Sequence, residues 1–174
     1  MAEADRKLRQ IAEKVSKLNK SSDEINDMIA AFEEKLAKMN IGIGVWVSDP
    51  DENFFDPNES FSLGTPVVRE DENDPKCKYV NATLLGFQKL SGIWRIVAWS
   101  IAFSERPDPK DPRGEEVCQT PLGGGDIWAL VDAPRECRIA ALKGMPLLFE
   151  AIENKVDELL RGIEEGKKHA ETLL

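Results

Sequence analysis

Side chains that commonly act as nucleophiles or metal ligands are scarce in this sequence. Its 174 residues contain three cysteines, Cys77, Cys118 and Cys137, and one histidine, His169. No two cysteines have the close spacing of a zinc knuckle or a redox pair, so we interpret them as reduced thiols. A catalytic cysteine needs a neighbouring base, and His169 is far in sequence from all three. The sequence therefore predicts no nucleophilic catalytic residue.

An acidic string at residues 49–53 could supply oxygen ligands to a cation. The string consists of Asp49, Asp51 and Asn53. It resembles the opening of an EF-hand calcium loop, but Phe54 stands where that loop has a glycine for the sharp turn. Ser60 stands where a bidentate glutamate is needed, although Glu59 is adjacent. We interpret the string as a solvated acidic turn and predict no metal-binding residue.

Two further groups could bind an anion. The glycines within residues 122–126 could direct backbone N–H groups at a phosphate, but no Lys-Ser or Lys-Thr pair follows, so a turning connection is the better interpretation. Arg135 and Arg138 could clamp an anionic group, or equally pair with Glu136 and Glu153. Among 32 Asp and Glu residues no pair stands out for acid–base work. We predict no catalytic residue, no cofactor-binding residue and no cofactor, and an enzyme is the less favoured class.

The elements that would position such residues begin with a long helix at the amino terminus. Apolar residues alternate at spacings of three and four, and this period of about 3.5 places a narrow stripe on one helix face, typical of a coiled-coil seam. The positions of the seam, one of them polar, are Leu8, Ile11, Val15, Leu18, Ser22, Ile25, Ile29, Phe32, Leu36 and Met39. A seam of this kind predicts that another helix covers it.

Residues 4–39 could form one continuous helix or a helical hairpin. A continuous helix would be roughly 50 Å long, longer than a domain of this size is wide. Ser21 and Glu24 have the spacing of a capping box, and Asn19 could end a preceding helix. The heptad phase passes through this point unbroken, so we favour the continuous helix.

The carboxyl-terminal residues 133–173 predict two more helices. Asp132 fits an N-cap with Pro134 in the first turn of a short helix that ends near Lys143. Pro146 is tolerated in a first turn, so a second helix begins at about residue 144 or 145. Its seam positions are Met145, Phe149, Ile152, Val156, Leu159, Ile163, Gly166, Ala170 and Leu173. The terminal helices could cover each other as an antiparallel, coiled-coil-like pair, or each could meet a second molecule.

The middle of the chain, residues 41–131, predicts a small antiparallel sheet of three to four strands. The third strand is apolar on both faces, so we expect it to be central, with helices covering at least one face. A Ser91-Gly92 turn joins the second and third strands into a hairpin. The candidate strands are 41–47, 79–90, 93–103 and 127–131, and the long loops are 49–65, 69–78 and 104–125. Core packing is the ordinary explanation for Trp46, Trp94, Trp99 and Trp128, and a binding platform is the alternative.

Composition and patterning together predict an α+β protein of one domain, residues 1–174. The formal net charge of −9 disfavours binding to nucleic acid and to anionic lipid. No apolar run is long enough to span a bilayer and no signal-peptide core follows the amino terminus, so we expect a cytoplasmic protein. The regular seams favour a non-enzymatic interaction or regulatory protein that binds a protein partner, or a second copy as a homodimer. The alternative is a small enzyme or ligand-binding domain with its site in the loops 49–65 and 104–125.

Overall fold

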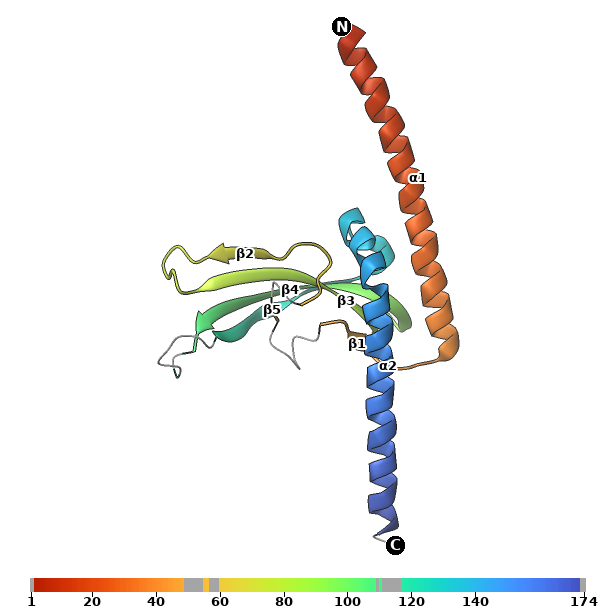
Figure 1. Cartoon of the computed structure of the whole chain (residues 1–174), viewed down its shortest axis with the longest axis vertical. Helices are drawn as coiled ribbons and strands as arrows, with labels where there is room; N and C mark the ends of the chain where they lie inside the picture. Colours follow the sequence, from red (N-terminus) through yellow and green to blue (C-terminus); the bar gives the residue numbers. More distant parts are fainter. Residues whose placement is uncertain (1, 49–54, 57–59, 109, 111–116, 173–174) are drawn as a thin grey trace.

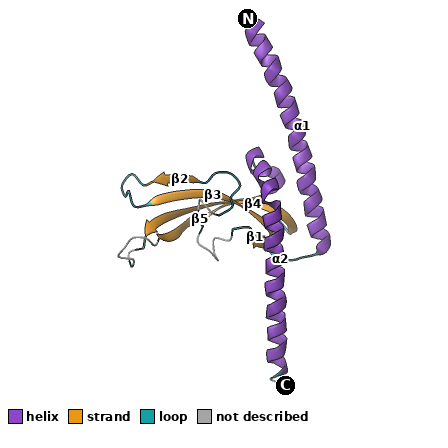
Figure 2. Cartoon of the chain, viewed as in Figure 1, coloured by secondary structure: helices purple, strands orange, loops and turns teal. Residues whose placement is uncertain are grey.

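The chain folds into two long helices and a five-stranded antiparallel sheet, which confirms the α+β class (Figures 1 and 2). The computed structural model describes residues 2–48, 55–56, 60–108, 110 and 117–172. In chain order the elements are α1 (Ala2–Met39), β1 (Val45–Trp46), β2 (Val67–Glu70), β3 (Lys78–Leu90), β4 (Ile93–Pro107), β5 (Val117–Ala129), the short 3-10 helix η1 (Leu130–Asp132) and α2 (Arg135–Glu171).

Helix α1 is continuous, as the unbroken heptad phase predicts. The hydroxyl of Ser22 donates to the carbonyl of Leu18 at 3.0 Å, so it returns to the preceding turn of the same helix and does not mark a second helix start. The helix ends at Met39, and the next residue, Asn40, has a φ of 49°, the left-handed conformation that commonly follows a last turn. The hairpin alternative is therefore wrong.

The sheet is built around the hairpin of β3 and β4, which pair from Leu90 and Ile93 to Lys78 and Glu105. Ser91 and Gly92 both have positive φ, which is the turn geometry that matches the twist of a two-residue hairpin. Strand β5 pairs with the other side of β4, so β4 is central, as expected. The short strands β1 and β2 both pair with β3. Because residues 67–70 form β2, the prediction of at most four strands is wrong by one strand.

Strand β5 occupies much of the segment that the sequence predicts to be the loop 104–125. Proline and glycine are tolerated here because β5 is an edge strand, and the β4–β5 register shifts twice between Trp99 and Phe103, as at a β-bulge. Gly125 lies so close to β4 that a Cβ atom would be 2.4 Å from the carbonyl oxygen of Ser100. The glycines therefore permit close pairing at this position.

Helix α2 is one helix where the sequence predicts two. It begins after Pro134, and Asp132 lies in η1 without serving as a side-chain cap, so the predicted N-cap is wrong. Pro146 lies inside the helix, where it removes one backbone hydrogen bond. The predicted boundary near residue 144 is absent because buried packing of Met145 and Leu148 continues across it.

The main core lies where the second half of α1 and the first half of α2 cover one face of the sheet (Figure 1). Ile29 and Leu36 of α1 and Leu148 of α2 pack there with Leu85 and Ile96 of the sheet. A second cluster lies on the opposite face. Its members are Phe55, Val80, Ala82, Leu84, Ile101 and Phe103, with Trp46 and Trp99 against them. All four tryptophans lie on strands, as predicted.

Replacement of Gly144 by alanine tests this packing. An added Cβ would lie 2.4 Å from the ring of Phe61 and 2.9 Å from Leu85, so we expect a loss of about 1–3 kcal/mol in unfolding free energy. Alanine has the higher helix propensity, by about 1 kcal/mol, and that gain opposes the loss. The matched control is Gly162→Ala on the same helix, where nothing lies within 4 Å of the added atom. Denaturant unfolding followed by tryptophan fluorescence gives both values, and equal stability of the two variants would contradict the packing.

Candidate protein-interaction surfaces

The first half of α1 extends beyond the body of the molecule (Figure 1). Every side chain from residue 3 to residue 21 is exposed, and we call this segment the N-terminal arm. Its seam positions are therefore uncovered: Leu8 is 63% exposed and Ile11 is 55% exposed, with Val15 and Leu18 also exposed. Ser22, the next seam position, is buried, so the body begins to cover the seam there.

The last part of α2 extends in the same way from the opposite end of the molecule (Figure 1). Residues 157–172 are all exposed, and we call them the C-terminal arm. Leu159, Leu160 and Ile163 form its apolar positions, with Leu160 and Ile163 both 53% exposed. Gly162 and Gly166 lie on the same arm with open space around them.

Between the arms, the two helices run in the same direction and touch along a limited stretch (Figure 1). Arg135 donates to the Asn19 amide oxygen at 3.0 Å, and Arg138 donates to that of Asn26. Further along, the rings of Phe32 and Phe149 meet edge to face, 5.5 Å between centroids. The antiparallel alternative is therefore wrong within the chain, and the two arginines contact α1 amides, whereas one of the alternatives paired them with Glu136 and Glu153.

Glu33 fixes α1 to the sheet. One carboxylate oxygen accepts from the backbone N–H of Ile96 at 3.0 Å, and the other pairs with Arg95 at 3.3 Å. The pairing of β5 with β4 starts only at Val97, so the carboxylate takes the N–H that a neighbouring strand would otherwise accept. With its side chain only 14% exposed, Glu33 is the polar contact that sets the direction in which α1 leaves the sheet.

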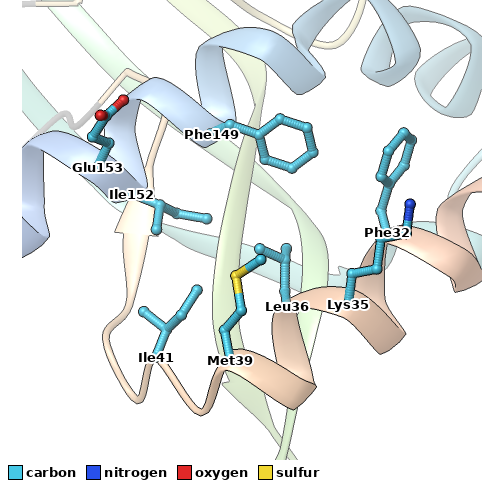
Figure 3. A pocket seen from close by; sticks show the side chains of 8 residues that line it. All are labelled: Phe32, Lys35, Leu36, Met39, Ile41, Phe149, Ile152 and Glu153. Atoms are coloured by element: carbon cyan, nitrogen blue, oxygen red, sulfur yellow. The ribbon is translucent and has the colours of Figure 1, made fainter.

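An apolar hollow of about 360 Å³ lies between the end of α1 and the middle of α2. Figure 3 shows Met39, Ile41 and Ile152 around this space, with the charged groups of Lys35 and Glu153 at its margins. Phe32, Leu36 and Phe149 complete the lining. The hollow adjoins the C-terminal arm, because Ile152 belongs to the same seam as Leu159.

A polar cluster closes the turn between β2 and β3. The Tyr79 hydroxyl donates to the Asp71 carboxylate at 2.7 Å, and Arg106 donates to the sulfur of buried Cys77 at 3.4 Å. Accepting this bond and the N–H of Asn73 lowers the pKa of Asp71. The same carboxylate raises the pKa of Tyr79. These bonds hold a turn together, and they assemble no nucleophile with a base.

A second hollow, of about 220 Å³, lies against Trp99 on the β4–β5 surface. Gln119 stands at its edge, where its amide accepts from the backbone N–H of Phe55 at 3.1 Å and donates to the Phe55 carbonyl at 2.6 Å. It also donates to Glu105 at 2.8 Å. The Gln119 side chain thus satisfies both backbone groups of Phe55, as a neighbouring strand would, and holds Phe55 in the second cluster.

The remaining predicted candidates are dispersed. Residues 49–54 and Glu59 lie outside the described residues, while Ser60 bonds the backbone of Asp56. The glycines at 123–125 lie in β5, and His169 is exposed on the C-terminal arm. Burial raises the pKa of the Cys137 thiol, which favours the unreactive form. Within the described part of the chain, no three His, Cys, Asp or Glu side chains gather to hold a metal ion.

Sequence inspection missed the three polar contacts that shape these surfaces. Glu33 and Gln119 form hydrogen bonds to residues that lie 62 to 64 positions away in the sequence. Tyr79 forms its hydrogen bond to Asp71, which is 8 positions away. Of these contacts, only the one between Asp71 and Tyr79 could have been predicted from nearby sequence, because both residues flank the same turn. The arms, in contrast, are the segments that the seam pattern indicates.

Comparison with protein-family models, curated protein sequences and solved structures found no significant match. Among the helices of the described residues, none combines the length and the apolar character needed to cross a membrane. We therefore infer function from the exposed arms and from the surfaces between them.

Removal of the Glu33 carboxylate tests the anchor of α1. We expect Glu33→Ala to lower the unfolding free energy by about 1–3 kcal/mol, because the buried N–H of Ile96 loses its acceptor. The control is Glu34→Ala, one residue along on the exposed side, where only an i,i+4 pair with Lys38 is lost. Denaturant titration of both variants decides the matter: if they unfold at the same midpoint, Glu33 is not an anchor.

Titration of the single tyrosine tests the β2–β3 turn. The bond to Asp71 favours the protonated phenol, so Tyr79 should ionise above the usual tyrosine pKa, and the bond is lost as pH rises through the raised value. Asp71→Asn should return the transition toward the ordinary pKa because the negative charge is gone. Absorbance at 295 nm reports this group alone among tyrosines. Glu72→Gln, on the same turn, should leave the transition unchanged.

Proposed function

We propose that this chain is a non-enzymatic protein-interaction or regulatory protein that acts through its two heptad-patterned helices. The observation that supports the proposal is the exposure of the arm seams, with Leu8, Ile11 and Ile163 each more than half exposed in the lone chain. A contiguous apolar stripe on a surface helix is typical of a binding surface.

The stability of the arms supports the same proposal. Each arm extends a helix whose other half is packed on the body, so nucleation costs it nothing extra, but propagation into water gains little for each added residue. The C-terminal arm carries Gly162 and Gly166, each of which lowers helix propensity by about 1 kcal/mol relative to alanine. Coiled-coil pairing with a further helix would supply the missing packing and cover the seams.

In this proposal the sheet positions the two helices and carries out no chemical reaction. It holds the second half of α1 through Glu33 and the first half of α2 through Met145 and Leu148, so that the arms leave at opposite ends. A partner helix would thus be bound at a fixed place and direction relative to the body. Such an arrangement suits a protein that links or spaces other proteins, and it requires no cofactor.

A small ligand-binding domain is the alternative, and the hollow against Trp99 supports it. The hollow has the aromatic wall and the few polar groups of a small-molecule site, including Gln119. The Gln119 amide is already engaged with Phe55 and Glu105, however, which leaves little of it for a ligand. The interaction function is therefore favoured.

Photo-crosslinking in the cells that naturally make the protein tests the proposal. A photoreactive side chain in place of Ile11, on the seam, should form a covalent adduct with another protein chain. The same side chain in place of Glu13, on the opposite side of the arm, should give at least tenfold less adduct, because only the seam is covered. No adduct from either position would overturn the proposal, and adduct mass would show whether the second chain is a copy or a different protein.

A further inference from the structure

The two arms extend from opposite ends of a parallel helix pair. Asn19 lies beside Arg135, 116 positions later, and Phe32 meets Phe149, so the helices run in the same direction with a fixed offset. The N-terminal arm extends beyond the start of α2, and the C-terminal arm extends beyond the end of α1 (Figure 1). Neither arm can cover the other within one chain, so a helix that covers either seam must come from a second molecule.

The arms are similar in length and opposite in charge. Residues 3–21 span about 28 Å and residues 157–172 about 24 Å at the rise of an α-helix. The N-terminal arm has six Lys and Arg residues against three Asp and Glu, although the whole chain has a net charge of −9. The C-terminal arm has five Asp and Glu residues against three Lys and Arg. Opposite net charge favours pairing of one arm with the other over pairing of like arms.

We propose that copies of this chain assemble head to tail into an open polymer, in which the N-terminal arm of one copy pairs in parallel with the C-terminal arm of the next. The inference rests on the proposed function and names a second copy as the partner of the same seams. The contact joins two different surfaces of the chain, so one uncovered arm remains at each end and further copies can add. Every copy inside the polymer has both seams covered.

The nearly equal lengths of the two helices select the register. Helix α1 has 38 residues and α2 has 37. A displacement of about 38 residues along the helices, or about 58 Å, places Met39 of the next copy beside Ala2 of the first. The same displacement places Glu171 of the next copy just ahead of Arg135, so both helices continue end to end without overlap. A displacement one heptad shorter would make the helix ends overlap, and one heptad longer would leave gaps.

This displacement brings the two seams into phase. Both seams follow the same alternation of four-residue and three-residue steps, starting at Ala4 and at Leu159. The resulting layers are Ala4 with Leu159, Leu8 with Ile163, Ile11 with Gly166, and Val15 with Ala170. Leu8 and Ile163, which are 63% and 53% exposed in the lone chain, form the layer with two large side chains. In the other three layers a small residue faces a larger one, which lets the helices interdigitate.

The bodies of successive copies do not meet in this arrangement. The sheet projects sideways from the part of the molecule where the helices overlap (Figure 1). The covered part of α2, residues 135–156, is about 33 Å long, so roughly 25 Å of paired arms separates one body from the next. The contact uses only segments that the lone chain leaves exposed.

The net charge of the arms decides the electrostatic balance of the contact. Beside the layers, Asp5 faces Lys155 and Lys7 faces Lys167, so the attraction of one pair offsets the repulsion of the other. The bodies, which carry the excess acidic residues, lie farther apart than the Debye length of about 8 Å at physiological ionic strength. Repulsion between bodies is therefore screened, and the opposite charges of the arms favour the contact.

Two blocked variants test the head-to-tail contact. Leu8→Lys places an unpaired cation in the seam of the N-terminal arm, and Ile163→Lys places one in the seam of the C-terminal arm. Each variant alone should sediment as a monomer, because one of the two unlike arms no longer pairs. In an equal mixture, the intact C-terminal arm of the first variant should pair with the intact N-terminal arm of the second. Assembly should then stop at two chains, whereas the mass of the unsubstituted protein should continue to rise with concentration.

Gln10→Lys is the matched control, because it adds the same charge on the outer side of the N-terminal arm and should leave the polymer intact. The tryptophan emission of every variant should remain that of the folded body, because the substituted side chains are exposed and all four tryptophans lie in the sheet. A dimer of either blocked variant alone would show pairing of like arms and would contradict the proposal. A mixture that stays monomeric would contradict it too.

Disulfide formation in the same mixture tests the parallel direction and the register. The Leu8→Lys chain carries Ala170→Cys and the Ile163→Lys chain carries Val15→Cys, both with the exposed Cys118 replaced by serine. These two cysteines share a layer, so oxidation should join the chains. Moving the second cysteine from position 15 to Ala4 shifts it by about 11 residues, or roughly 16 Å, too far for a disulfide. We expect at least about tenfold less cross-linked product there, and equal yields would refute the register.

An unsubstituted protein that is monomeric at all concentrations would also overturn head-to-tail assembly. The proposed function would survive that result if the photoreactive side chain at position 11 forms an adduct with a different protein. It would fail as well if no adduct forms. The two measurements therefore separate failure of the assembly from failure of the interaction function.

Discussion

An apolar stripe on a helix must be removed from water, and both stripes of this chain are longer than the surface that covers them. The sheet and the helix pair cover the seam of α1 from Ser22 to Leu36 and that of α2 from Met145 to Ile152, apart from Phe149 at the open hollow, which is 37% exposed. Beyond these limits the same periodicity continues on exposed arms. A period maintained where the chain itself offers no contact is the basis on which we propose a contact outside the chain.

The sheet makes this arrangement possible because it holds α1 by its second half and α2 by its first half. Glu33 accepts the N–H of Ile96 at the point where β5 has not yet joined β4, so one carboxylate both completes the sheet and orients α1. Gly144 lets α2 approach Phe61 and Leu85 closely. The second half of α1 and the first half of α2 are held on one face of the sheet, so each helix has one free end, and their shared direction places the two free ends on opposite sides of the body.

Polar side chains replace missing strand neighbours at several places in the fold. Glu33 does so for β4, and Gln119 does so for the segment at Phe55, whose N–H and carbonyl both bond the amide. Such contacts satisfy backbone groups where regular pairing stops, and a buried group without a partner would be costly. They hold the geometry of the body without forming a catalytic group, which is consistent with a positioning role for the sheet.

The sequence by itself determined the elements whose information is local and periodic. The 3.5-residue period predicted α1 and most of α2, the β3–β4 hairpin followed from the Ser91-Gly92 turn, and the tryptophans were placed on strands. Tertiary structure alone decided that Pro121 and Gly125 lie in an edge strand, that Pro146 lies within a helix, and that the helices run in the same direction. These features depend on neighbours brought from distant parts of the chain, whose packing overrides local preference, and a period along one helix carries no information about which helix lies beside it.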